Sequence, residues 1–175
     1  NSHAEVNTCA RCHARRGQVH VPYTPDAPLA DTHRLALLTE GLYYADGQIQ
    51  DEVFVHGSFI QSRMFHQGVT CSDCHEPHSL QLRAPGNAVC ARCHAPARYD
   101  SAEHHHHPMT DTAGAKGSGT ACIDCHMPER NYMVIDARAD HSLRVPRPDL
   151  AAALGTPDAC TGCHAELTPA QAAAQ

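Results

Sequence analysis

Large hydrophobic side chains are scarce in this chain. Its 175 residues include no tryptophan, and aromatic residues make up only 5% of the total. Proline and glycine, which interrupt helices and strands, account for 12 and 11 residues. A chain of this length ordinarily buries a core of large apolar residues. The scarcity of such residues argues against an ordinary apolar core and indicates that a bound group fills the interior.

Positive charge and long apolar runs are also lacking. The 13 basic residues are outnumbered by 19 acidic ones, and the formal net charge is -6. No basic stripe is available for nucleic acid, so we expect no nucleic-acid partner. The longest aliphatic run, residues 35–38, is far shorter than the roughly 18 residues that span a bilayer, so we expect no transmembrane segment. The first residues do not resemble a signal peptide, and we expect a processed chain or an excised domain.

Cysteine and histidine, by contrast, are abundant, with 10 and 16 residues. Every cysteine falls in one of five pairs separated by two residues, and a histidine directly follows each pair. Composition alone gives five such histidines with a probability of about 10⁻⁵. The pattern C-x-x-C-H is the attachment signature of c-type haem. It predicts covalent attachment through Cys9, Cys12, Cys71, Cys74, Cys90, Cys93, Cys122, Cys125, Cys160 and Cys163.

The spacing within each motif follows from the chemistry of attachment. Two thiols add across the two vinyl groups of one haem, and two intervening residues in a helical turn separate the sulfurs suitably. The next residue then directs its imidazole to the iron. The sequence therefore predicts five c-type haems with iron, and the proximal iron ligands are His13, His75, His94, His126 and His164.

Three other uses of paired cysteines fit less well. Structural zinc takes four ligands, usually from two pairs, and gives no reason for the adjacent histidine or for an odd number of pairs. A disulfide framework needs ten oxidised cysteines and also leaves the histidines unexplained. Thioredoxin-like pairs accompany a βαβ pattern, which this sequence lacks.

Several longer stretches also suggest a family. They are residues 46–49 (DGQI), 69–79 (VTCSDCHEPHS), 86–90 (GNAVC), 125–128 (CHMP), 140–142 (DHS) and 145–148 (VPRP). With these stretches the chain resembles the multihaem c-type cytochromes, and more closely a pentahaem module often joined to tetratricopeptide repeats. The resemblance implies a multihaem cytochrome c fold, in which short α-helices and long loops wrap five covalent haems with little or no β-sheet. We expect a single domain over residues 1–175, with a C-terminal helical extension beginning at 168–175.

Each haem iron has a second axial position, and histidine is the expected ligand there. Five of the 16 histidines are proximal ligands, so eleven remain, whereas the chain has only four methionines. Bis-histidine coordination is therefore expected at most or all sites. His20, His56 and His66 are expected to be surface residues or partners of haem propionates. The distal candidates, of which the resemblance supports the first two, are His78, His141, His107, His105, His33 and His3.

Local patterns predict a few elements around the motifs. Helices are expected over residues 29–42 and 58–66, the second ending before Gly68, and short strands over 53–55 and 132–135. Asp46 and Gly47 mark a turn, and the stretch 112–120 is expected to be a loop. Residues 144–148 are expected to be extended because of their prolines, and a helix is expected to begin at Thr168.

These features predict an electron-transfer protein. Two histidines per iron favour comparatively low reduction potentials. The expected partners are redox proteins, and the chain is a candidate for a homo-oligomer or conducting filament through its terminal haems. The alternative is an oxidoreductase with one open haem that acts on a small nitrogen or sulfur compound, but the surplus of histidines favours a carrier over an enzyme. Because c-type haem is attached outside the cytoplasmic membrane of prokaryotes, we expect an exported, periplasmic or extracellular protein.

Overall fold

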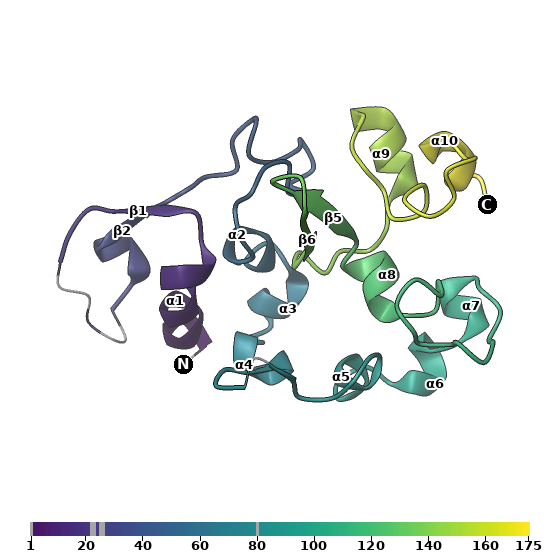
Figure 1. Cartoon of the computed structure of the whole chain (residues 1–175), viewed down its shortest axis with the longest axis horizontal. Coiled ribbons are helices and arrows are strands. Elements are labelled where there is room, and N and C mark those ends of the chain that lie inside the picture. The colour runs from purple at the N-terminus through teal and green to yellow at the C-terminus, as the bar shows by residue number, and fades with distance from the viewer. Residues whose placement is uncertain (1, 22–23, 25–26, 80) are drawn as a thin grey trace. The chain divides into compact units, whose positions relative to one another are not determined.

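The computed structural model describes residues 2–21, 24, 27–79 and 81–175 (Figure 1). Its contacts divide the chain into two compact units that alternate along the sequence. The first unit comprises Asn1–Cys71 and Arg130–Leu143, and the second comprises Ser72–Glu129 and Arg144–Gln175. The expectation of one haem-wrapped domain over residues 1–175 stays a prediction.

The first unit begins with a helix that carries the first motif. Helix α1 (Ser2–His13) is followed by strand β1 (Arg16–Gln18), which pairs in antiparallel fashion with β2 (His33–Leu35). A short 3₁₀ helix, η1 (Leu29–Asp31), lies between these strands in the sequence. The small apolar cluster that joins these elements consists of Ala10, Ala14, Leu29 and Leu35.

The rest of the first unit contains two short helices and a strand pair. These are α2 (His56–Phe59), α3 (Arg63–His66), β5 (Glu129–Tyr132) and β6 (Asp136–Ala139). The Tyr132 hydroxyl donates to the carbonyl of Ile49 (3.2 Å), and both side chains pack in one buried cluster. This contact ties the segment that follows the fourth motif to the segment that precedes the second.

The second unit is built almost entirely from short helices and loops. Its described residues include only two buried hydrophobic side chains, Ala121 and Ala151. The unit therefore lacks a core of large side chains, and the expected fold class of short helices with little β-sheet is confirmed. Its elements, with α4 beginning at the last residue of the first unit, are α4 (Cys71–Cys74), β3 (His75–Glu76), β4 (Gln81–Leu82), α5 (Ala88–Ala91), α6 (Pro96–Tyr99), α7 (Ala102–His105), α8 (Cys122–His126), α9 (Pro148–Leu154) and α10 (Pro169–Ala172).

The helix predicted over residues 29–42 is wrong. Only the 3₁₀ turn η1 forms there, and the Thr32 hydroxyl closes it by donating to the carbonyl of Leu29 (3.3 Å). The chain then enters β2, whose pairing with β1 satisfies backbone groups that a helix would have paired internally. His33, expected on the helix, consequently lies on a strand.

The helix predicted over residues 58–66 is interrupted. Helix α2 ends at Phe59 and α3 begins at Arg63, because the Ser62 hydroxyl caps α3 by accepting the N–H of Phe65 (3.1 Å). Residues 53–55 form a turn into α2 instead of a strand, and Phe54 has a φ of 60°. Of the strand predicted over 132–135, only Tyr132 belongs to β5, and the other residues form the turn to β6.

Other local predictions are confirmed. Residues 112–120 form turns and loop, and Gly47 adopts a φ of 86° in the turn that follows Asp46. The extended segment before α9 ends at Arg147, because Pro148 already begins the helix. Thr168 caps α10 by accepting the N–H of Gln171 (3.2 Å). Among the described residues, no helix is long and apolar enough to cross a bilayer.

Candidate haem attachment sites

The cysteines of all five motifs lie in a helix or a tight turn, and His75 of the second motif begins β3. The first ends α1, the second starts with α4, and the fourth occupies α8. In the third and fifth motifs, the histidine N–H donates to the carbonyl of the first cysteine, at 3.0 Å for His94 and 2.8 Å for His164. All ten cysteines lie in the described part of the chain, and none forms a disulfide. Each motif thus presents two thiols and one imidazole from a single turn of backbone.

Among the described residues, the cysteines are not gathered into a structural zinc site. Burial raises the pKa of Cys74, Cys125 and Cys160, and raises that of Cys71 to about 12, whereas a hydrogen bond with Cys90 lowers the pKa of Cys122 to about 7. Among the described residues, one group of possible metal-ligating side chains comes together, and its three members, Glu5, Cys9 and Cys71, are one short of a structural zinc site. The residues present therefore fit covalent haem.

The proximal histidine of the fourth motif is oriented by its backbone surroundings. Nδ1 of His126 donates to the carbonyl of Arg144 (2.9 Å), which leaves the Nε2 lone pair for a metal. In the fifth motif, Nδ1 of His164 lies 3.5 Å from the Glu166 carboxylate. The ring of His94 meets that of Tyr99 edge-on, with ring centres 5.5 Å apart. His13 is exposed at the end of α1, and His75 is half-buried on β3.

The run of histidines at 104–107 supplies a partner ring to each of two proximal histidines. His104 and His126 have ring centres 6.0 Å apart and planes within 15°. His107 and His164 have centres 5.9 Å apart and planes within 26°. Metal–imidazole bonds are about 2.0–2.1 Å long, so two rings that share one metal have centres about 6 Å apart. Both pairs match this centre-to-centre distance, with their rings stacked.

The backbone conformation of residues 104–107 explains why these histidines reach different motifs. His106 adopts a left-handed φ of 61° at the end of α7, which turns the chain so that His104 and His107 reach different motifs. Gly119 leaves room for His107, since a Cβ there would lie 2.5 Å from the His107 ring. Nδ1 of His107 donates to the carbonyl of His105 (2.6 Å), so its Nε2 carries a free lone pair.

His105 is placed differently from its neighbours. Its Nδ1 accepts the backbone N–H of His107 (3.2 Å), which puts the ring proton on Nε2. That Nε2 is buried and has no hydrogen-bond partner among the described residues. A protonated Nε2 has no lone pair for iron, so this tautomer opposes ligation by His105. Its role as a distal ligand stays a prediction, and His104, which the sequence analysis omitted, takes the more suitable position.

The other distal candidates lie in varied settings, and their roles stay predictions. Nδ1 of His141 donates to the carbonyl of Ala139 (2.9 Å), which leaves Nε2 for a metal. The side chain of His78 is 95% exposed and approaches Glu76 at 3.2 Å. His33 is buried beside the Thr32 hydroxyl (2.9 Å), and burial, Arg16 and Arg11 lower its pKa. The ring of His3 meets Phe65 edge-on, with centres 5.3 Å apart.

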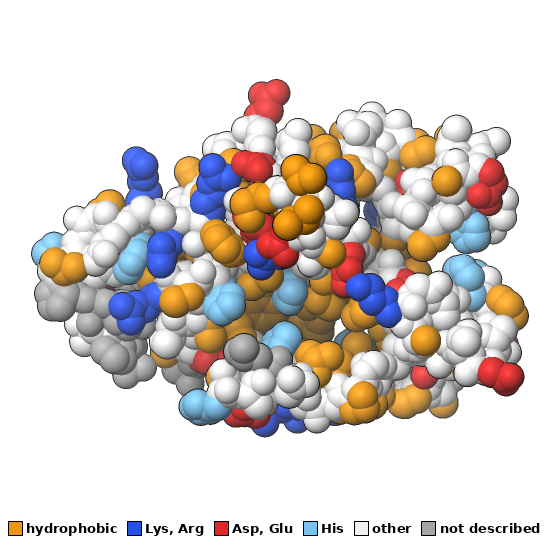
Figure 2. Space-filling model, in the orientation of Figure 1, with side chains coloured by type: hydrophobic (Ala, Val, Ile, Leu, Met, Phe, Trp, Pro, Cys, Tyr) orange, Lys and Arg blue, Asp and Glu red, His pale blue; other side chains and the backbone are white. Residues whose placement is uncertain are grey.

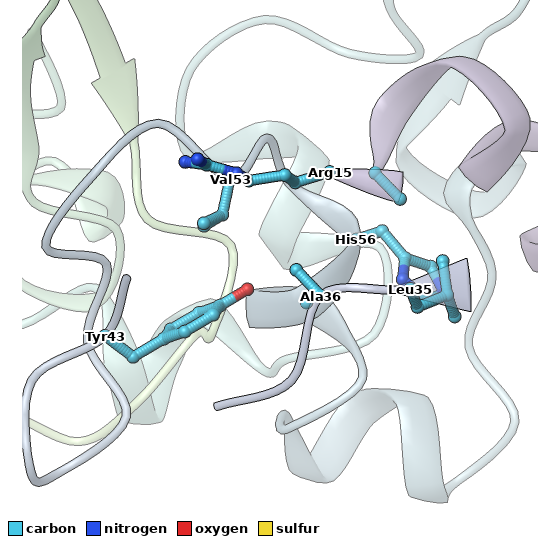
Figure 3. Close-up of a pocket in the computed structure, with 8 residues that line it drawn as sticks. Arg15, Leu35, Ala36, Tyr43, Val53 and His56 are labelled. Atoms are coloured by element: carbon cyan, nitrogen blue, oxygen red, sulfur yellow. The ribbon is translucent and has the colours of Figure 1, made fainter. Parts of the chain in front are cut away.

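His56, expected at the surface or beside a haem propionate, is buried. It begins α2 and lines a small pocket of the first unit together with Leu35, Tyr43 and Val53 (Figure 3). Burial lowers its pKa, so the ring is neutral at neutral pH. Gly57, which follows His56, allows Tyr43 to approach closely. No local sequence pattern predicts this packing.

Large apolar side chains remain open at the surface. Val134 and Ile135, in the turn between β5 and β6, are 88% and 87% exposed, and Leu37 is 73% exposed. Figure 2 displays hydrophobic and histidine side chains on the visible face of the polypeptide. Together with the missing core of the second unit, this apolar surface fits a protein whose bound macrocycles supply much of the interior.

Comparison with known proteins agrees with this geometry. Residues 64–99 match a family model described as the doubled CXXCH motif, which covers the second and third motifs. The fold and its motifs together are similar to those of multihaem c-type cytochromes. One solved structure that the chain resembles is the outer cell wall cytochrome OcwA, with a TM-score of 0.69 and 19% sequence identity. The match covers 97% of this chain but 50% of OcwA, so the chain spans half the length of that protein. No curated protein matches the sequence.

Proposed function

We propose that this chain is an electron-transfer protein that carries five covalent c-type haems, most or all of them held between two histidines. When bound, each haem iron supplies a one-electron redox couple. The observation that supports this best is the pairing of His104 with His126 and of His107 with His164, at 6.0 and 5.9 Å. Two axial imidazoles leave no open position for a substrate, which favours a carrier over a catalyst.

The chain's own groups fix the ligand orientation on which this function depends. The Arg144 carbonyl holds the Nδ1 proton of His126, and the His105 carbonyl holds that of His107. Each ring is thereby fixed in the tautomer that offers Nε2 to a metal, and its rotation is restricted. Such restraint keeps the ligand set unchanged between oxidation states, which suits rapid one-electron transfer.

The proposed function includes a location outside the cytoplasm, in the periplasm or at the cell exterior. Covalent haem attachment takes place there, and the similar protein OcwA is an outer cell wall cytochrome. The partners are redox proteins that exchange single electrons. A homo-oligomer or filament joined through the terminal haems is a variant of this function.

Carbon monoxide binding to the reduced protein tests the proposal, because carbon monoxide takes an open axial position. The parent is expected to bind none, and His104→Ala and His107→Ala are each expected to bind one equivalent. His106→Asn is the matched control, since it changes an exposed member of the same run and asparagine tolerates a left-handed φ. Stoichiometric binding to the parent would instead favour an oxidoreductase with one open haem.

A further inference from the structure

The attachment motifs contact one another in the order in which they occur along the chain. We propose that the five haem sites form one unbranched line in motif order, so that the first and fifth sites are its ends and the third is an obligatory middle. This inference rests on the proposed electron-transfer function and specifies the route that electrons take through the chain. Each of the four links depends on contacts within one of the two compact units.

The first and second motifs meet through their leading cysteines. In the first unit, ligating atoms of Glu5, Cys9 and Cys71 lie within 4.8 Å of one another. The thiols of Cys9 and Cys71 also hydrogen bond. Each of these sulfurs carries a thioether in the mature protein, so the edges of the first two haems are neighbours.

The second and third motifs are joined by the residues inside them. Arg92, the third residue of the third motif, donates from its guanidinium to the carbonyl of Asp73, the third residue of the second motif. The second motif thus contacts the first motif through Cys71 and the third motif through Asp73.

The third and fourth motifs are held together by Asn87, which lies three residues before Cys90. Its side-chain carbonyl accepts the N–H of Cys122 (2.8 Å), the first residue of the fourth motif. Its amide group donates to the carbonyl of Thr120 (2.9 Å). The segments that begin the third and fourth motifs are therefore joined through one side chain.

The fourth and fifth motifs share the histidine run. His104 faces His126 of the fourth motif, and His107 faces His164 of the fifth. His104 and His107 are only three residues apart in the sequence. A short run that serves two sites requires those sites to be adjacent.

The line implies a simple electron balance. One electron arrives at an end site from an external one-electron reductant, and one electron leaves the opposite end to an external one-electron oxidant. No bond forms or breaks in the chain, and no proton is required. Loss of an interior site therefore separates the line into two parts, whereas loss of an end site only shortens it.

Flash reduction from one end tests this order. Ala165 is exposed and directly follows the fifth motif, so Ala165→Cys offers a single free thiol for a ruthenium photosensitiser once haem has consumed the native cysteines. With a sacrificial donor, the labelled parent is expected to show rapid reduction of five haems. After removal of the first motif (Cys9→Ala with Cys12→Ala), four haems are expected to be reduced rapidly. After removal of the third motif (Cys90→Ala with Cys93→Ala), only two haems are expected to be reduced rapidly. Intact mass verifies four haems in each variant.

Two different outcomes would contradict the linear order and the proposed function separately. Rapid reduction of all four remaining haems after loss of the third motif would overturn the linear order, while failure of the parent to accept electrons would overturn the proposed function instead. If the third-motif variant does not fold, the iron positions in a crystal of the unmodified holoprotein answer the same question. Nearest iron neighbours are expected to be consecutive motifs, and any other pairing contradicts the proposal.

Discussion

Asn87 joins two haem attachment motifs through one side chain, which makes it a sensitive point of the second unit. Its amide group donates to Asp100 (3.1 Å) and to the Thr120 carbonyl (2.9 Å), and its oxygen accepts the N–H of Cys122 (2.8 Å). Asn87→Ala removes all three hydrogen bonds. At a net value near 1 kcal/mol for each bond, the variant is expected to lose about 3 kcal/mol of stability.

Guanidinium chloride unfolding of the holoprotein, followed by circular dichroism, measures this loss. With a denaturant slope of about 4 kcal/mol/M, the midpoint is expected to fall by about 0.7 M. Asn131→Ala is the matched control, because Asn131 is exposed on β5 and its loss is expected to cost less than about 0.5 kcal/mol. Equal midpoints for the two variants would refute the claim that Asn87 joins the third and fourth motifs.

Three further predictions concern other parts of the molecule. Gly57→Ala places a Cβ 2.0 Å from the Tyr43 hydroxyl and is expected to lower the free energy of unfolding by about 1–3 kcal/mol in thermal melts, whereas Gly17→Ala, with open space around it, is the control. The side-chain hydrogen bond from Arg147 lowers the pKa of Asp149 from 3.8 to about 2. Stabilisation of the start of α9 is therefore present above pH 3.8 and lost as the pH falls toward 2. Hydrogen exchange of the α9 amides is expected to accelerate over this pH range, and over a higher pH range in Arg147→Gln. Intact mass of the holoprotein is expected to equal the chain plus five haems, and a lower count contradicts the motif assignment.

The sequence predicts what depends on near neighbours along the chain. The spacing of cysteine and histidine in each motif is local, so the attachment residues can be predicted without a structure. The same holds for Thr168, whose capping of α10 requires only Gln171. The expectation that bound groups replace a core agrees with a second unit whose described residues bury only two alanines.

Features that depend on distant segments could not be predicted. Residues 33–35 join a strand because residues 16–18 are available to pair with them, although their own sequence favoured a helix. The choice between His104 and His105 depends on the left-handed turn at His106 and on the distant positions of His126 and His164. The burial of His56 depends on Leu35 and Tyr43, which no local pattern connects to it.

The strand pair β5–β6 has a consequence for how the protein matures. Tyr132, which donates to Ile49, and Arg138, whose guanidinium lies 3.2 Å from the Glu52 carboxylate, complete the first unit from a segment that follows the fourth motif. Contacts so distant in sequence form late and slowly. Four of the five motifs precede this segment in the sequence. We therefore expect the first unit to close only after the fourth motif has been synthesised.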